Sequence, residues 1–214
     1  MPKKPFEQLA ARQKQKIYKI SLELLANNGY DRTSIKMITK RLKVADGYLH
    51  YYFYGKEDLV KWALENGLDS WMDHFRVHVE QRHPKDLYEL YKYSIAQMIR
   101  FTRTHHDLFA AYMRLVDEPH TALAKYLYEK ISWIDKLYIK AIEDEMEKGT
   151  LRSDVPAPLI AAILDVINTR FQEYCYNPGL DPIGVSKMDD SQVNELTDKV
   201  LSILRHGLNP QPAG

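Results

Sequence analysis

Apolar residues recur every three or four positions along nearly the whole chain, and this spacing predicts α-helices. The first run covers residues 6–26, and Asn27, Asn28 and Gly29 end it because these residue types tolerate the left-handed backbone that closes a helix. Eight further helical stretches follow, at residues 34–42, 45–52, 56–82, 85–104, 106–117, 119–148, 157–177 and 190–206. β-Branched residues nowhere alternate with polar ones at a period of two. The pattern therefore predicts an all-α protein of about nine helices.

A helix, a tight turn and a very short second helix occupy residues 34–52. Thr33 or Ser34 can cap the first of these helices, because a hydroxyl oxygen can accept a hydrogen bond from a free backbone N–H group. Residues 43–47 are too few and too polar for anything but a connection. In a helix-turn-helix protein the second, recognition helix enters the DNA major groove and the first, supporting helix braces it. The spacing predicts such a module.

The charge distribution supports this interpretation. The formal net charge of the chain is only +1, but residues 1–60 carry twelve Lys and Arg against six Asp and Glu. The remaining 154 residues carry 18 basic and 23 acidic side chains. A basic N-terminal part joined to a slightly acidic remainder favours a polyanion such as nucleic acid as the partner of the first part alone.

Composition excludes several classes of protein. The chain has 214 residues, of which 45% are hydrophobic and 28% charged, as is typical of a globular protein with a sizeable core. The sequence contains no run of about 18 apolar residues, so no membrane span is predicted. The first residues lack the apolar core of a signal peptide. The single cysteine, Cys175, cannot form an internal disulfide. These features predict a protein of the reducing cytoplasm.

The motifs of catalysis and cofactor binding are also missing. The sequence contains no glycine-rich phosphate loop, no nucleophile elbow and no zinc signature, so we expect neither an enzyme nor a cofactor. His74 and His78 are spaced to share one face of a helix, but no framing glutamate or cysteine completes a set of ligands. We therefore expect two solvated histidines and no metal.

Two segments carry a resemblance to a known family. They are ANNGYDRTSI at residues 26–35 and LKVADGYLHYYFYGKEDL at residues 42–59. Together with Ile38, they resemble the N-terminal signature of tetracycline-repressor (TetR) family regulators. The resemblance extends over residues 14–62, and the remainder matches the family only in length and helical character.

The resemblance implies a ligand-responsive transcriptional regulator with two domains. Residues 1–55 would form the helix-turn-helix DNA-binding domain, and residues 56–214 a helical domain for effector binding and dimerisation. Such a protein would be a repressor that binds a palindromic double-stranded DNA operator as a homodimer. A small apolar or aromatic effector would release it. A non-regulatory alternative stays open on the sequence alone: an all-helical interaction or scaffold protein without sequence-specific DNA binding.

The resemblance also places six residues at the DNA. Thr33 would cap the supporting helix and approach a phosphate, and Gly47 would let the recognition helix pack closely on the supporting helix. Three aromatic side chains of the recognition helix would face the DNA, and Lys56 would meet a phosphate at the start of the long helix. With Lys36, a basic residue of the supporting helix, the full set of predicted DNA contacts is Thr33, Lys36, Gly47, Tyr48, His50, Tyr51 and Lys56.

The chain departs from the family pattern at the start of the recognition helix. Ala45 and Asp46 stand where the family commonly has serine and lysine. Asp46 therefore either caps the recognition helix or accepts a hydrogen bond from a cytosine amino group. The missing positive charge would be offset by Lys36 or by an N-terminal arm. The basic residues of that arm are Lys3, Lys4, Arg12, Lys14 and Lys16.

Two further sets of residues belong to the C-terminal part. Broad apolar stripes on its last two helices predict a dimer interface, formed by Leu159, Ile163, Ile167, Phe171, Val193, Leu196, Val200 and Leu204. Aromatic side chains and methionine suit an adaptable effector pocket. The residues predicted to line it are Trp71, Tyr91, Phe101, Phe109, Tyr112, Met113, Trp133 and Asn168.

Overall fold

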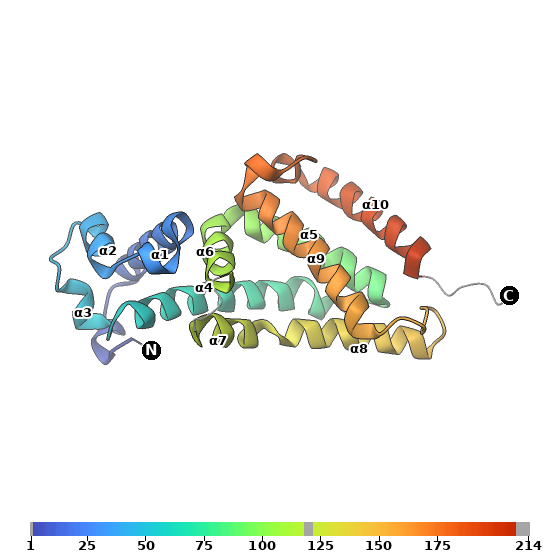
Figure 1. The fold of residues 1–214 in the computed structure, drawn as a ribbon, viewed down its shortest axis with the longest axis horizontal. Helices are drawn as coiled ribbons and strands as arrows, with labels where there is room; N and C mark the ends of the chain where they lie inside the picture. Colours follow the sequence, from blue (N-terminus) through green and yellow to red (C-terminus); the bar gives the residue numbers. More distant parts are fainter. Residues whose placement is uncertain (1, 118–121, 209–214) are drawn as a thin grey trace. The chain divides into compact units, whose positions relative to one another are not determined.

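A computed structural model describes residues 2–117 and 122–208, and within them the chain is all-α, as the hydrophobic pattern predicts (Figure 1). Short 3₁₀ helices join several of the α-helices, the first of them η1 (Lys4–Phe6). The α-helices are α1 (Ala11–Arg32), α2 (Ile35–Leu42), α3 (Tyr48–Tyr52), α4 (Lys56–His78), α5 (Leu87–Thr104), α6 (His106–Val116), α7 (Ala122–Ile131), α8 (Trp133–Glu147), α9 (Ala157–Tyr176) and α10 (Asp190–Leu208).

The described residues thus contain ten α-helices rather than about nine, and the difference arises at one residue. The pattern predicts a single helix over residues 119–148, where the structure has α7 and α8, separated at Ser132; the start of the predicted span lies outside the described residues. Ser132 keeps a nearly helical backbone, with φ −61° and ψ −11°. The break therefore leaves the apolar spacing almost unchanged, and periodicity alone does not reveal it.

The first helix also differs at both ends from the predicted span of residues 6–26. It starts at Ala11, because the chain before it forms η1. Gly29 has φ 76° and ψ 175°, so the helical geometry is broken where the sequence predicts an end, and a further turn runs on to Arg32. Glycine adopts this positive φ without the steric cost that other residues meet.

The chain folds as two compact units. Unit 1 comprises residues 1–70 and 105–130, and unit 2 comprises residues 71–104 and 131–214. Helix α4 contributes residues to both units. The two units are defined by which residues pack together. The predicted boundary after residue 55 instead separates the DNA-binding part from the part expected to bind the effector and to dimerise. That boundary stays a prediction.

Unit 1 is built on α1, which packs against α2 and α6. Its core includes Ile17, Ile38 and Leu49, each at most 1% exposed. Helix α4 approaches this core at Gly67, where a β-carbon would overlap the Leu108 side chain. An added methyl group would have to push aside the ends of the Leu108 and Tyr18 side chains, which costs free energy because the core is closely packed.

Unit 2 is centred on α5, which packs against α8, α9 and α10, while α8 also packs on α9 (Figure 1). Tyr91, Ile95 and Ile99 are at most 1% exposed and form the inward face of α5. Among the described residues, no helix combines the length and the apolar character that a bilayer span needs.

Candidate functional site

The turn between α2 and α3 is made tight by Lys43. This residue has the left-handed conformation, with φ 59° and ψ 46°, and its N–H group donates to the carbonyl oxygens of Lys40 and Thr39. Val44 N–H also donates to the Thr39 carbonyl, at 3.1 Å. On the far side of the turn, Leu49 is fully buried. The predicted helix-turn-helix arrangement is therefore present in unit 1.

The cap of α2 differs from the one that the resemblance implies. Ser34 is the N-cap, and its hydroxyl oxygen accepts a hydrogen bond from Met37 N–H at 3.2 Å. Thr33 is 1% exposed, and its hydroxyl donates to the carbonyl oxygens of Gly29 (2.8 Å) and Leu24 (3.2 Å). The predicted cap at Thr33 is wrong, because its hydroxyl is used to hold the kinked end of α1. Whether Thr33 approaches a phosphate stays a prediction.

Two expectations for the start of α3 are also corrected. A β-carbon on Gly47 would meet nothing within 4 Å, so close packing against α2 does not explain this glycine. Gly47 is itself the N-cap residue of α3, and no side chain caps that helix end. Asp46 therefore does not cap α3. Its carboxylate is exposed, and the alternative contact with a cytosine amino group stays a prediction.

Two of the three predicted aromatic contacts are exposed on α3. Tyr51 is 63% exposed, and the His50 side chain is also exposed. Tyr48 is half-buried, with its ring 5.2 Å from the ring of Tyr52. Partial burial, together with the Tyr52 hydroxyl, raises the pKa of Tyr48, so its phenol stays protonated and can donate a hydrogen bond. Leu49 and Phe53, on the opposite side, are fully buried.

Two lysines flank the recognition helix. Lys36 is exposed on α2. Lys56 is half-buried at the start of α4, where its Nζ donates to the Tyr30 carbonyl at 3.1 Å and lies 4.0 Å from the centre of the Tyr30 ring. Free N–H groups at a helix start favour an anion, and Lys56 adds positive charge there. Whether either lysine contacts a phosphate stays a prediction.

The N-terminal arm is folded onto α3, which the sequence did not predict. Lys3 donates from Nζ to the His50 carbonyl and from its backbone N–H to the Tyr52 carbonyl, both at 2.8 Å. Lys14 Nζ donates to the Glu7 carbonyl at 2.8 Å, and Lys16 Nζ to the Leu42 carbonyl at 3.4 Å. Three of the five arm lysines and arginines expected to meet phosphates are thus held by backbone carbonyls.

Comparison with known proteins agrees with this geometry. Residues 17–62 match the family model described as bacterial regulatory proteins, tetR family. The chain is a TetR-family transcriptional regulator. Its relative YerO of Bacillus subtilis, an HTH-type transcriptional regulator, is 24% identical over 92% of this chain and 68% of its own length. The interaction or scaffold protein left open by the sequence is thereby set aside.

Solved structures of TetR-family regulators show the same fold. One from Chloroflexus aurantiacus has a TM-score of 0.80, with 18% identity over 99% of this chain and all of its own. The regulator FadR from Bacillus subtilis, solved in complex with stearoyl-CoA, has a TM-score of 0.70 and 17% identity over 91% of this chain and 98% of its own. TetR-family regulators are DNA-binding proteins rather than enzymes, so no catalytic residue is assigned to this chain.

The structure divides the predicted effector-pocket residues of this TetR-family regulator between the two units. Phe109, Tyr112 and Met113 belong to α6 in unit 1. The other five are in unit 2, where four are buried and Trp133 is half-buried, its indole N–H donating to Met72 Sδ at 3.3 Å. The eight residues are therefore not brought together within one compact unit.

A buried polar group lies in unit 2 among three of its helices. The Tyr91 hydroxyl donates to the Leu164 carbonyl at 3.1 Å, and the Tyr91 ring centre is 6.2 Å from that of Tyr138. The hydroxyl oxygen of Tyr138 and the side-chain oxygen of Asn168 are buried, and neither makes a well-formed hydrogen bond within the described residues, although the Ser94 and Asn168 side chains lie close enough to the Tyr138 hydroxyl to act on its pKa. Burial raises the pKa of both tyrosines, so both phenols are neutral. Unsatisfied buried polar atoms are costly and call for an explanation.

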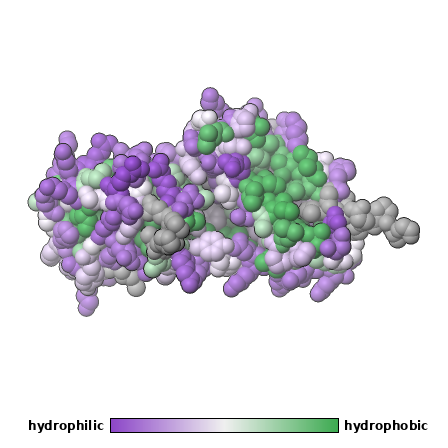
Figure 2. All heavy atoms as spheres, viewed as in Figure 1, coloured by the Kyte–Doolittle hydropathy of each residue, from purple (hydrophilic) through white to green (hydrophobic). Residues whose placement is uncertain are grey.

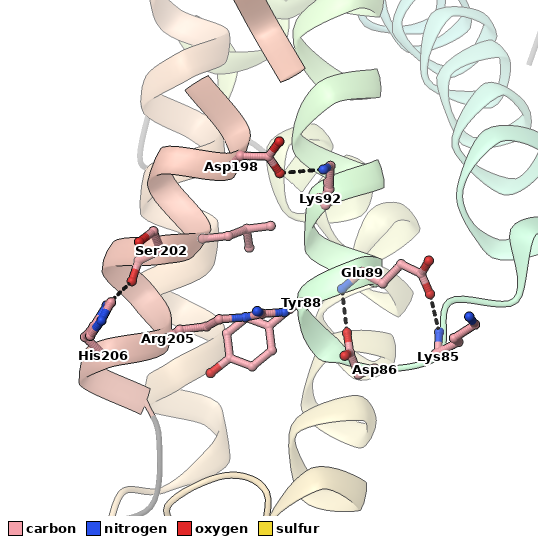
Figure 3. A pocket seen from close by; sticks show the side chains of 10 residues that line it. Lys85, Asp86, Tyr88, Glu89, Lys92, Asp198, Ser202, Arg205 and His206 are labelled. Atoms are coloured by element: carbon pink, nitrogen blue, oxygen red, sulfur yellow. Dashed lines mark hydrogen bonds and ion pairs between the residues drawn. The ribbon is translucent and has the colours of Figure 1, made fainter. Parts of the chain in front are cut away.

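A surface groove of about 560 Å³ in unit 2 has a different character (Figure 3). It lies between the first turns of α5 and the last turns of α10, and charged side chains line most of it. Lys92 and Asp198 form an ion pair there, and the Arg205 guanidinium lies 4.7 Å from the centre of the Tyr88 ring. None of the predicted pocket residues lines this groove, and its charged walls do not suit an apolar effector.

Only some of the residues predicted for the dimer interface are exposed on the single chain, and their role in a dimer stays a prediction. Leu159 is 52% exposed and Ile163 45% exposed, while Ile167, Leu196, Val200 and Leu204 are partly exposed. Val193 is fully buried and Phe171 is 8% exposed, so these two belong to the core of unit 2 and are wrong as interface residues. Periodicity marks apolar faces but does not say which face a neighbouring helix covers.

Two exposed apolar residues of the C-terminal helices are absent from the predicted interface. Val166 is 66% exposed on α9 and Ile203 is 74% exposed on α10. Figure 2 shows a broad hydrophobic area on the surface formed by these C-terminal helices. Monomeric proteins rarely leave such an area open to water.

His74 and His78, whose spacing would allow them to share a metal, pack against each other in the structure. The ring centres of His74 and His78 are 4.3 Å apart, and the His74 ring centre is 5.1 Å from that of Phe101. Both side chains are half-buried rather than fully solvated as expected. The described residues include no cluster of three or more potential metal ligands.

Proposed function

We propose that this TetR-family regulator is a repressor that binds a palindromic operator as a homodimer and releases it when a small, mostly apolar effector enters unit 2. The observation that carries DNA binding is the division of α3 into two sides. Leu49 and Phe53 are fully buried, while Tyr51 is 63% exposed. One side of the helix anchors it to unit 1, and the other presents aromatic and hydrogen-bonding side chains to a groove.

Dimerisation is supported by the apolar surface of α9 and α10. Leu159, Ile163 and Val166 follow one another at steps of four and three residues, so they share one face of α9. The occupant that we assign to this face is a second copy of the chain, since a two-fold axis lets the same patch serve both partners. A dimer also doubles the number of phosphate contacts, which a single helix-turn-helix module lacks for tight binding.

The effector chemistry follows from the buried polar group of unit 2. The Tyr138 hydroxyl and the Asn168 amide can hydrogen-bond an uncharged polar group, such as a hydroxyl, carbonyl or amide. Arg103 has a buried Nε in unit 2, but its guanidinium lies at Val185 and Cys175, and the charge that acts on the Tyr91 and Tyr138 hydroxyls is that of Asp165. A bound carboxylate or phosphate would therefore lie in this interior without a countercharge, which is strongly unfavourable. This supports a mostly apolar effector with a neutral polar group.

Release from DNA requires only that the effector bind one dimer state better than another. A ligand that fits a conformation with altered spacing between the two recognition helices shifts the population away from the DNA-bound state. Binding energy in unit 2 is thereby converted into a lower affinity for the operator.

Selection of bound duplexes from a random DNA pool tests the proposal directly. The purified protein is expected to enrich a two-fold symmetric sequence that survives competition by random DNA. Placed across a promoter, that sequence is expected to lower transcription in vitro when the protein is added. A pool without enrichment refutes operator binding, and increased transcription refutes repression.

The effector is tested by thermal denaturation with paired compounds. Uncharged apolar alcohols and amides are expected to raise the melting temperature of the parent protein, and the matched carboxylates are not. Tyr138→Phe is expected to keep nearly the parental stability, because the hydroxyl it removes makes no well-formed hydrogen bond within the described residues, but to lose much of the ligand-induced shift. Equal shifts for the carboxylates would contradict the neutral-effector assignment.

A further inference from the structure

The recognition helix is too short to hold its own orientation. Helix α3 has five residues, and an isolated helix of this length is unstable because the cost of its first turn is never recovered. The backbone carbonyls of its last turn have no partner within the helix itself. Its geometry therefore depends on what surrounds it in unit 1.

Residues 2–9, which we term the clasp, satisfy the open end of α3. The two donors of Lys3 reach the carbonyl oxygens of His50 and Tyr52, 47 and 49 residues further along the chain. The ammonium of Lys3 also brings positive charge to the C-terminal end of the helix, where it interacts favourably with the helix dipole. Lys3 is in addition 4.8 Å from the centre of the Tyr54 ring.

Phe6 anchors the clasp in the core. Its side chain is 5% exposed, and its ring centre lies 4.8 Å from that of Trp62, 4.9 Å from that of Phe53 and 6.0 Å from that of Tyr52. Tyr52 and Phe53 are the last residue and the C-cap of α3, while Trp62 belongs to α4. Phe6 thus fills the space between the end of the recognition helix and the following helix.

The clasp is also closed on itself. Phe6 N–H donates to the Lys3 carbonyl at 2.9 Å, and Leu9 N–H to the Phe6 carbonyl at 3.1 Å. Lys14, from α1, donates to the Glu7 carbonyl at 2.8 Å and lies 5.4 Å from the centre of the Phe6 ring. The segment is therefore fixed at both ends, to α3 through Lys3 and to α1 through Lys14.

From these contacts we infer that the clasp is a positioning element for the recognition helix, through which residues that do not touch DNA determine base specificity. The inference rests on the proposed DNA contacts of α3. A shift of about 1 Å at a side chain that forms oriented hydrogen bonds is enough to break them, so loosening the clasp lowers discrimination between sequences. The clasp lies outside residues 17–62, the part of the chain that the family model matches.

Three variants separate positioning from general stability. Phe6→Ala removes the anchor, Phe6→Leu keeps an apolar side chain in its place, and Leu25→Ala is the matched control. Leu25 is 3% exposed in unit 1, on α1, and takes no part in the described clasp contacts. All measurements are made at a temperature at which circular dichroism shows each variant to be fully folded.

The first readout is amide hydrogen exchange of residues 48–54 without DNA. Phe6→Ala is expected to raise exchange in this segment about tenfold, while Phe6→Leu and Leu25→Ala leave it near the parental value. Unchanged exchange in Phe6→Ala, or an equal increase in Leu25→Ala, would overturn the inference. Because this readout needs no DNA, it decides whether the clasp holds α3 even if the parent protein binds no duplex and the proposed function fails.

The second readout is the ratio of affinities for the selected operator and for random duplex. Phe6→Ala is expected to lower this ratio about tenfold, the effect of one mismatched base pair, with random-duplex affinity and salt dependence unchanged. Lys3→Met tests the competing role of Lys3 as a direct phosphate contact. A salt slope lower by about 0.9 per half-site in Lys3→Met would show that the arm binds DNA itself, and would overturn the positioning role.

Discussion

The apolar face of α9 allows the sharpest test of the proposed homodimer. Ile163 and Val166 are 45% and 66% exposed, and both are replaced by aspartate in one double variant. Complete burial of such a side chain stabilises a protein by about 1.5–3 kcal/mol, so covering the exposed half of each contributes ~1 kcal/mol. Each residue occurs twice in a symmetric dimer, which makes the contribution of the pair about 4 kcal/mol.

Removal of this contribution corresponds to a dimer dissociation constant about 1,000-fold higher. Four carboxylates brought together at the two-fold axis repel one another and raise it further. Sedimentation velocity over a range of protein concentrations measures the change. The parent is expected to sediment as a dimer at micromolar concentration, and the double variant as a monomer.

A matched control uses an apolar residue away from α9 and α10. Val77 is 52% exposed on α4, so Val77→Asp introduces the same charge at a similarly exposed position and is expected to leave the dimer intact. A parent that sediments as a monomer at every concentration refutes the homodimer. A dimer that survives in the double variant shows instead that α9 is not the interface.

Three further outcomes are expected. Lys36→Ala weakens binding to every duplex and lowers the salt slope by about 0.9 for each phosphate that the lysine neutralises, whereas Tyr51→Ala changes which sequences are preferred; parental binding by both variants would contradict the assigned contacts. Gly67→Ala forces a methyl group against Leu108 and lowers stability by about 1–3 kcal/mol in thermal denaturation, and an unchanged midpoint would argue against the close packing of α4. Burial raises the pKa of the Cys175 thiol to about 11, so iodoacetamide alkylates it only after unfolding. As the pH rises, the thiol of the unfolded chain ionises before that of the folded chain. The stability that the neutral, buried thiol contributes is therefore present below about pH 9 and is lost as the pH rises towards 11.

Local patterns predicted the helix-turn-helix module well, because the spacing of apolar residues within one helix depends only on that helix. The same patterns left two hydroxyls as possible caps of α2. The choice between them depends on the kink at Gly29, which turns the Thr33 hydroxyl towards the Gly29 and Leu24 carbonyls. Ser34 is then the residue left to cap the helix. Residue types alone do not contain this information.

The errors in the C-terminal part have a common physical origin. Val193 and Ile203 are both apolar residues of α10, yet one is fully buried and the other is 74% exposed. The difference is set by α5, which packs against α10 and covers one of its faces. A sequence pattern shows that a face is apolar, but the neighbouring helix decides whether it belongs to the core or remains available to a partner.

Long-range contacts also limit what can be transferred from relatives to this chain. The side chains proposed to face the bases lie on a helix of five residues, held by the turn at Lys43, by buried Phe53 and by the clasp. The clasp lies outside the matched residues 17–62, so a match to the family model does not by itself include the support that orients α3. Since hydrogen bonds to base edges depend on position and angle, identical contact residues on a differently supported helix would select different bases. With the positioning role proposed for the clasp, operator preference depends on unit 1 as a whole, and it must be measured on the full chain.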